Sequence, residues 1–397
     1  MKKNGFNKNL TAIPISEQGS ILNGAHRVAC AIDLGINVKG IRVNAPPQIL
    51  NYQFFKKRGA STKFLDKCSL QFINSSPNTY IALFWPIAKG NHKEIFQILE
   101  KIVYYKEIEL SIDGLHSLLT VVYKNEPWLG AQNKNFPGAY GKLVHCFSER
   151  NPIRVIVFQS DSLKDVQNKK NQLRKLFGLE KHSVHINDTH EEAIRISKTI
   201  FNANGIHFFN HGKPNKNKET KNKIDSFKKY CIKNQLDLND VAIDSGLTME
   251  LYGLRKSNDI DYLSIKKPKY VPKDYAESKI SLHDGNELTH HGKSSENIIY
   301  DIESYFIYDD VKFVSLTQVM IMKMSRREKK DIVDVGLIKN LLEKENHLKY
   351  FILKVRSQLL FVKTRVFMSM INWMGYLGLY NFVRFIYRTI FKKNKLS

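Results

Sequence analysis

Residues 244–263 read DSGLTMELYGLRKSNDIDYL, a stretch that joins a small-residue turn, a short helix and an acidic pair. The pair consists of Asp259 and Asp261, which stand two positions apart at the start of an apolar run. Side chains two apart in a strand point to the same face, so both carboxylates are expected to reach one hard cation. Mg²⁺ is the hard cation that accompanies nucleotide phosphates. The pair therefore predicts metal-assisted phosphoryl or nucleotidyl transfer.

The segment around this pair resembles the nucleotidyltransferase superfamily, whose core is a strand, a Gly-Ser turn, a helix and a strand bearing Asp-x-Asp. The resemblance implies a first strand at 241–243, Ser245 as the serine of the turn, and Asp259 and Asp261 as catalytic metal ligands. Further along the chain it implies a helix whose basic side chains reach a phosphate group. The basic residues that match this helix are Lys323, Arg327 and Lys330, with Asp331 and Asp334 beside them.

Two features depart from the family pattern. Asp244 stands before Ser245 where the family has glycine, and the glycine follows at Gly246. An acid at that position opposes the binding of a triphosphate. The third carboxylate of the family is left open among Asp301, Glu303, Asp309 and Asp310. The alternative interpretation is that Asp259 and Asp261 are solvated acids at a strand end.

A second resemblance lies near the N-terminus, where residues 19–31 read GSILNGAHRVACA. We expect a strand at 20–22, a helix over 25–34 that ends at Gly35, and a strand over 38–43. The pattern resembles the ParB/sulfiredoxin fold, in which a small turn precedes a His-Arg pair that opens a helix. A helix N-terminus favours anions, so the resemblance implies contacts to the phosphates of ATP, CTP or ADP. The matching residues are Asn23, Gly24, His26 and Arg27. The alternative is an ordinary helix start with Arg27 in a surface ion pair.

The middle of the chain gives weaker signals. Strands are expected at 80–85, 118–123 and 154–158, and helices at 92–104, 162–177 and 189–203, the last with Asp188 as its N-cap. Three basic residues share a predicted helix and favour a solvated basic face: Lys169, Lys170 and Arg174. His182, His185, Asp188 and His190 cluster together, but no established zinc-ligand spacing joins them.

The net charge of +24 over 397 residues indicates an anionic partner. Four cysteines lie far apart without a CxxC pair, which predicts reduced thiols in the cytoplasm. The N-terminal residues contain no apolar h-region, so no signal peptide is expected.

Every charged side chain from Lys354 onward is basic, and an uncharged aromatic stretch separates Arg365 from Arg384. This pattern predicts amphipathic helices that lie on an anionic membrane surface. A helical lid on the protein's own core and nucleic-acid binding are the alternatives. No recognised DNA- or RNA-reading module accompanies the tail, so nucleic acid is the less favoured partner.

The sequence therefore predicts a multidomain α/β (mixed α+β) protein with four regions. They are a ParB/sulfiredoxin-like unit (1–77), a middle α/β domain (78–212), a nucleotidyltransferase-like domain (220–345) and a basic amphipathic helical tail (346–397), with the polar segment 211–218 as a linker.

The favoured function is a Mg²⁺-dependent nucleotidyl- or phosphotransferase that uses ATP or CTP. It would act on a small-molecule or lipid-linked acceptor at the inner face of the plasma membrane, in bacterial surface-polysaccharide or cell-envelope synthesis. The tail, residues 350–397, would hold it there. Two alternatives stay open: a ParB-like small-molecule kinase with a degenerate nucleotidyltransferase domain, and a non-enzymatic nucleotide-sensing regulator that binds nucleic acid.

Overall fold

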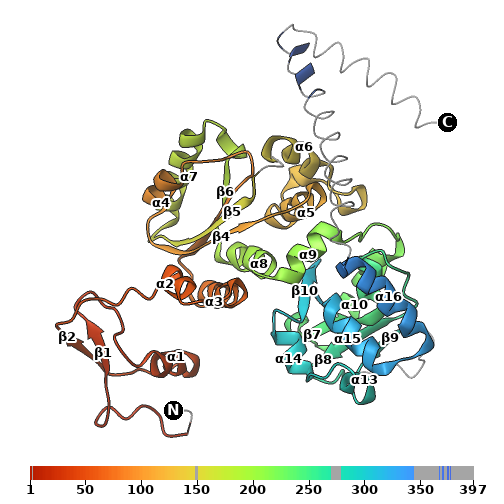
Figure 1. The fold of residues 1–397 in the computed structure, drawn as a ribbon, viewed down its shortest axis with the longest axis horizontal. Coiled ribbons are helices and arrows are strands. Elements are labelled where there is room, and N and C mark those ends of the chain that lie inside the picture. Colours follow the sequence, from red (N-terminus) through yellow and green to blue (C-terminus); the bar gives the residue numbers. More distant parts are fainter. Residues whose placement is uncertain are drawn as a thin grey trace. The chain divides into compact units, whose positions relative to one another are not determined.

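The computed structural model describes residues 1, 3–147, 151–269 and 279–343, together with six positions between 366 and 376. The chain is a mixed α/β protein, as the sequence predicts, and it divides into two compact units, residues 1–65 and 66–397 (Figure 1). The larger unit contains two separate sheets.

The smaller unit is built around a parallel pair of strands, β1 (Ile13–Ser16) and β2 (Gly40–Val43). Helix α1 (Ala25–Leu34) connects them and ends at Gly35, whose φ of 63° is a left-handed conformation that glycine adopts readily. The expected helix is confirmed, and β2 lies within the expected strand 38–43. The strand expected at 20–22 is wrong, because only Ile21 forms an isolated bridge to Ile15. Helix α2 (Tyr52–Lys57) follows, and α3 (Thr62–Ser75) continues into the larger unit.

The first sheet of the larger unit has the strand order β4-β5-β3-β6, with all neighbouring pairs antiparallel. Its strands are β3 (Thr79–Phe84), β4 (Ile102–Ile108), β5 (Ile153–Gln159) and β6 (Val184–Ile186). Helices α4 (His92–Leu99) and α7 (Leu163–Phe177) cover one face, and their apolar side chains form a core with Phe84, Ile156 and Phe158.

Around this sheet also lie helices α5 (Ile112–Val122), α6 (Pro137–Cys146), α8 (His190–Ile200) and α9 (Ala203–His211). The strands expected at 80–85 and 154–158 are confirmed as β3 and β5. The strand expected at 118–123 is wrong, because it lies in α5. The helix expected over 92–104 ends at Leu99, and β4 follows it. The N-cap of α8 is Thr189 rather than Asp188, since the Thr189 side chain accepts from the amide of Glu192.

The second sheet has five strands in the order β10-β11-β7-β8-β9. They are β7 (Val241–Asp244), β8 (Ile260–Ser264), β9 (Ile280–Leu282), β10 (Tyr305–Tyr308) and β11 (Val311–Val314). Strand β7 runs antiparallel to β8 and parallel to β11, while β8 and β9 are parallel. The central strand β7 is buried along its whole length, which places the start of the DSG turn at the centre of the sheet.

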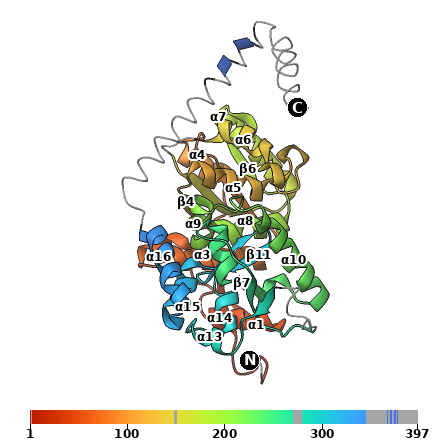
Figure 2. The same ribbon diagram turned by 90° about the vertical axis from the view of Figure 1, so that its right-hand side faces the viewer.

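The helices of this region are α10 (Glu219–Asn234), α11 (Ser245–Leu251), α13 (Asn286–Thr289), α14 (Ser295–Tyr300), α15 (Leu316–Arg326) and α16 (Lys329–Glu343). Helices α15 and α16 pack side by side (Figure 2). The segment expected as a linker is hydrogen-bonded to this region, since the Lys213 amide donates to the Leu251 carbonyl over 2.8 Å.

The predicted tail lies outside the described residues, apart from six helical positions. Among those six, Val366, Met370 and Trp373 expose apolar side chains. In the part of the chain that the structure describes, no helix is long and apolar enough to cross a membrane.

Candidate functional site

Three polar side chains form a row from the central strand β7 to the edge strand β9 of the five-stranded sheet. Asp244 ends β7 and pairs in register with Asp261 of β8, which in turn pairs with Ser281 of β9. Residues opposite one another on neighbouring strands project to the same face. The Ser281 hydroxyl donates to Asp261 Oδ1 over 3.0 Å, which confirms that these two side chains meet.

The local sequence explains why the chain turns sharply after β7. Asp244 is the N-cap of α11, and its carboxylate accepts the Ser245 amide over 2.7 Å. Ser245 is buried and holds a left-handed φ of 52°, a conformation that non-glycine residues rarely adopt. A Cβ at Gly246 would lie 3.1 Å from the Ser257 Cβ and 3.8 Å from Asp259 Oδ1. The glycine therefore allows the turn to pack against the loop that carries Asp259.

Buried Glu250 of α11 fixes that loop. Its carboxylate accepts the Ser257 amide over 2.6 Å, the Thr220 hydroxyl over 2.6 Å and the Lys223 ammonium over 2.7 Å. Burial alone would raise the pKa of Glu250, but these hydrogen bonds hold the value at about 2. The ionised carboxylate thus ties the start of β8 to α10.

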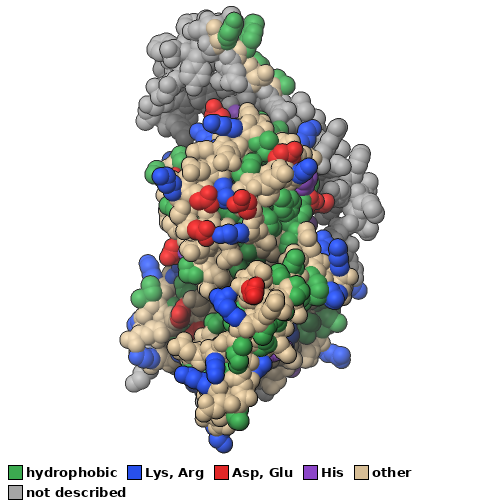
Figure 3. All heavy atoms as spheres, turned by 90° about the vertical axis from the view of Figure 1, so that its left-hand side faces the viewer, with side chains coloured by type: hydrophobic (Ala, Val, Ile, Leu, Met, Phe, Trp, Pro, Cys, Tyr) green, Lys and Arg blue, Asp and Glu red, His purple; other side chains and the backbone are tan. Residues whose placement is uncertain are grey.

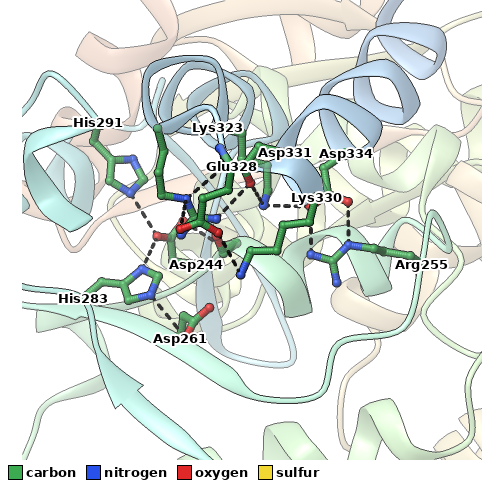
Figure 4. A network of polar contacts seen from close by, with 12 residues as sticks. Asp244, Arg255, Asp261, His283, His291, Lys323, Glu328, Lys330, Asp331 and Asp334 are labelled. Carbon is green, nitrogen blue, oxygen red and sulfur yellow. Dashed lines mark hydrogen bonds and ion pairs between the residues drawn. The ribbon is translucent and has the colours of Figure 1, made fainter. Parts of the chain in front are cut away.

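Two histidines converge on Asp244 (Figure 4). His283 follows β9, and His291 follows α13. His283 Nδ1 and His291 Nε2 each lie 3.0 Å from Asp244 Oδ2, and His283 Nε2 lies 3.2 Å from Asp261 Oδ1. The Gln318 amide nitrogen lies 3.4 Å from His291 Nδ1, so both ring nitrogens of His291 have a polar neighbour.

His283 is different, because both of its ring nitrogens face carboxylates. A histidine can donate from both nitrogens only when it is protonated. Burial lowers the pKa of His283, but its hydrogen bonds to Asp244 and Asp261 outweigh this effect and raise the pKa to about 10. The same two histidines hold the pKa of buried Asp244 well below its usual range, against the effect of its burial. The charge expected at position 244 is thus offset by an imidazolium.

Asp259 lies in the bend just before β8 rather than in the strand itself. It is exposed and lines a pocket of about 660 Å³ between α10 and the start of β8, whereas 15% of the Asp261 side chain is exposed. Four lysines also line this pocket: Lys223, Lys229, Lys233 and Lys279.

Arg255 connects the acidic pair to α16. Its guanidinium binds Asp334 over 2.7 and 2.9 Å, and this contact, together with the charges of Asp259 and Asp261, raises the pKa of Arg255. Both acids therefore lie within electrostatic range of one arginine.

The basic residues expected to reach a phosphate lie in different environments. Lys323 is buried and contacts Asp331 over 3.0 Å and Asp334 over 2.8 Å. Lys330 is 65% exposed and pairs with Glu328 over 3.2 Å. Arg327 is the C-cap of α15, and its Nε donates to the Met324 carbonyl. The ion pairs of Lys323 join α15 to α16 and leave its ammonium surrounded by acids (Figure 4).

The four candidates for a third carboxylate are all paired with lysines elsewhere. Asp301 and Glu303 contact Lys67, Asp309 contacts Lys221 and Lys228, and Asp310 contacts Lys124. The acid beside Asp261 is instead Asp244. Sequence reasoning also missed His283 and His291. The alternation Ile280-Ser281-Leu282-His283 is the signal that could have placed Ser281 and His283 on one strand face.

In the smaller unit, the four residues expected to contact phosphate do lie together. Asn23, Gly24, His26 and Arg27 line a pocket of about 400 Å³ at the N-terminus of α1. Gly24 has a φ of 89°, and a Cβ there would lie 2.8 Å from Arg27 Nη2. Arg27 also donates to the Thr11 hydroxyl and to the Ala12 carbonyl, so its guanidinium is partly engaged within the unit.

Part of the histidine cluster at 182–190 and two basic residues of α7 have partners within the protein. Within the described ranges, no three His, Cys, Asp or Glu side chains converge closely enough to coordinate a metal by themselves. His185 binds Glu192 over 2.9 Å. Lys169 and Lys170 are not solvated as expected: Lys169 contacts Glu100 and Asp165, and Lys170 contacts the Ile186 carbonyl.

Comparisons of the chain with models of known families, with curated proteins and with solved structures find no match.

Proposed function

We propose that this protein is a Mg²⁺-dependent nucleotidyl- or phosphotransferase in which Asp259 and Asp261 hold the metal. The observation that carries the proposal is the exposed carboxylate of Asp259 in a lysine-lined pocket, two residues from Asp261. The resemblance of residues 241–264 to the nucleotidyltransferase superfamily supports the same assignment.

The donor set fits Mg²⁺. This ion is commonly held by one or two carboxylates, with water and substrate phosphates completing its octahedron, so a third protein ligand is not required. When bound, Mg²⁺ would neutralise phosphate charge at the site. Ser281 and His283 orient Asp261 through their contacts of 3.0 and 3.2 Å, and Arg255 adds positive charge beside both acids.

The substrate class is a nucleoside triphosphate, ATP or CTP, and the pocket lysines would bind its phosphates. The acceptor would be a small molecule or a lipid-linked sugar in bacterial cell-envelope synthesis. The basic tail, residues 350–397, would hold the enzyme at the anionic inner face of the plasma membrane.

A second candidate is favoured by the pocket of the smaller unit. Asn23, Gly24, His26 and Arg27 line it together, which supports phosphate binding there by a ParB-like kinase. In this alternative the imidazolium of His283 takes the place of a metal between Asp244 and Asp261, and the acidic site is degenerate.

Transfer of label from ATP and CTP, labelled at the α or γ phosphate, separates the two candidates. For the nucleotidyl- or phosphotransferase we expect Mg²⁺-dependent transfer that falls by at least about 100-fold in the Asp259→Asn/Asp261→Asn double variant. Asp284→Asn is the matched control, because Asp284 is an exposed acid just after His283 and its only described ion pair, with Lys267, is 4.0 Å long. Undiminished transfer in the double variant, with loss in Arg27→Gln, would establish the kinase instead.

A further inference from the structure

Five basic side chains gather beside the four-stranded sheet. The acidic residues described above belong to the other sheet. The five basic side chains come from α6, from the last turn of α7 and from the short 3₁₀ turn Glu180–His182. We call them the cationic cluster: Lys142, His145, Arg174, Lys181 and His182.

The contacts within the cluster bring its members close together. Lys142 Nζ donates to the Lys181 carbonyl over 3.1 Å and lies 4.9 Å from the centre of the Tyr123 ring. The rings of His145 and His182 lie with their centres 4.6 Å apart and their planes tilted by 36°. The charges of Lys181 and Arg174 act on Lys142, and such like charges repel one another unless an anion lies between them.

The cluster also contains buried nitrogen atoms without hydrogen-bond partners. Arg174 Nε and His182 Nδ1 are both buried and have no hydrogen-bond partner. A buried N–H without a partner costs about 1–3 kcal/mol, so such groups are rare in folded proteins. Arg174 Nε–H is such a group, and together with the unpaired Nδ1 of His182 it indicates a missing partner at the cluster.

Arg174 differs from two other basic residues of its helix. Lys169 and Lys170 on the same helix contact carboxylates, whereas the Arg174 side chain makes no hydrogen bond or ion pair with any described residue. No carboxylate of the described residues pairs with any member of the cluster.

The pKa values in the cluster also reflect an excess of positive charge. Burial, followed by the charges of Lys181 and Arg174, lowers the pKa of Lys142. Burial, followed by the charges of Lys142, His145 and Lys181, lowers the pKa of His182 to about 4. Negative charge placed in the cluster would relieve both effects.

We propose that the cationic cluster is a binding site for the phosphate group of a soluble small molecule. A phosphate offers several acceptor oxygens, which match the unpaired Arg174 Nε–H, the Lys142 ammonium and, when it carries a proton, Nδ1 of His182. Trp128 lies 5.0 Å from Tyr123 and is 44% exposed, so an aromatic surface adjoins the site for the rest of the ligand. This site is independent of the proposed transferase function.

The test follows the titration of His182 in the full chain by NMR with ¹³C-labelled histidine, with its signal assigned by His182→Gln. Inorganic phosphate, added at constant ionic strength, should raise the His182 midpoint by about one pH unit, because an adjacent anion stabilises the imidazolium. A soluble phosphate monoester should give at least the same shift. The shift should vanish in Lys142→Met and in Arg174→Gln, neither of which removes a described ion pair.

Lys164→Gln is the matched control, because Lys164 is exposed at the opposite end of α7 and the variant loses the same charge. It should keep the full shift. The proposal is overturned if phosphate and the monoester leave the His182 midpoint unmoved, or if Arg174→Gln responds like the wild type. A response only to vesicles of anionic lipid would also overturn it, since the site would then recognise a membrane surface.

Discussion

At the scale of single residues, the state of His283 decides the chemistry of the acidic site. Its two ring nitrogens face Asp244 and Asp261, so the imidazolium is the form that satisfies both contacts. The free energy of folding therefore depends on whether this ring keeps its second proton.

We predict that His283 makes the protein less stable as the pH rises. Its pKa is raised from 6.5 to about 10 in the folded chain, so its stabilising contribution is complete below 6.5 and is lost as the pH rises towards 10. Within that window the free energy of unfolding should fall by about 1.4 kcal/mol per pH unit for this one proton. Urea unfolding at a series of pH values measures the slope.

The matched experiment uses the His283→Gln variant. Its free energy of unfolding should not fall in this way between pH 6.5 and 8. Above 8 a second group acts in the opposite direction: burial lowers the pKa of Lys312 to about 8, so the folded chain sheds that proton before the unfolded chain does. Subtracting the two proteins' curves removes the Lys312 contribution. Identical slopes in wild type and variant below pH 8 would show that His283 is not held as the imidazolium.

Sequence reasoning located Asp259 and Asp261 but not the partners that set their environment. His283 and His291 lie 39 and 47 residues from Asp244, beyond the reach of any local pattern. The same limit applies to Lys323 and Lys330, which look alike in the sequence. One is 1% exposed between two acids and the other is 65% exposed, because only packing decides which face of a helix pair is inside.

At the scale of secondary structure, helix capping and burial determine the outcome where the local sequence fits both a strand and a helix. The run Leu118–Tyr123 is rich in apolar and β-branched residues, which favours a strand. It is helical because Ser111 caps α5 through the Gly114 amide and because the buried side chains repeat with helical spacing. Those buried positions are Leu115, Leu118, Leu119 and Val122. By contrast, α1 with its terminal glycine was predictable from local sequence alone.

Helix α6 offers a second test, because its two glycines occupy opposite environments. A Cβ at Gly138 would lie within 2.9 Å of the Trp128 carbonyl carbon and 3.0 Å from the Leu129 Cα, whereas nothing lies within 4 Å of a Cβ at Gly141. We predict that Gly138→Ala lowers the free energy of unfolding by about 1–3 kcal/mol through overpacking. Gly141→Ala should raise it by up to about 1 kcal/mol, because alanine favours the helix.

Chemical denaturation of the two variants beside the wild type measures both changes. The substitutions are chemically identical and lie on one helix, so each controls for the other. If Gly138→Ala were as stable as Gly141→Ala, the close contact between α6 and residues 128–129 would have to be absent.

At the scale of the whole molecule, the excess of positive charge calls for an explanation. On the face drawn in Figure 3, Lys and Arg side chains are scattered among acidic ones rather than gathered into a single basic patch. Many of the described lysines are also paired with acids, as in α7 and α10. The last 44 residues, 354–397, by contrast contain nine basic side chains and no acidic one. Composition alone could predict this asymmetry, whereas the pairing of the remaining lysines required the fold.

We therefore predict that the tail carries most of the attraction to anionic membranes. Each basic residue near such a surface contributes about 1 kcal/mol, so replacing five of them should weaken binding to anionic vesicles by at least roughly 100-fold. The variant changes Arg384, Arg388, Lys392, Lys393 and Lys395 to glutamine in the full chain, and co-sedimentation measures the binding. The control removes the same charge from five exposed lysines elsewhere: Lys56, Lys57, Lys89, Lys93 and Lys164. Because electrostatic attraction falls off within a Debye length, the control should bind nearly as the wild type does. Equal losses in the two variants would mean that net charge, rather than the tail, attracts the membrane.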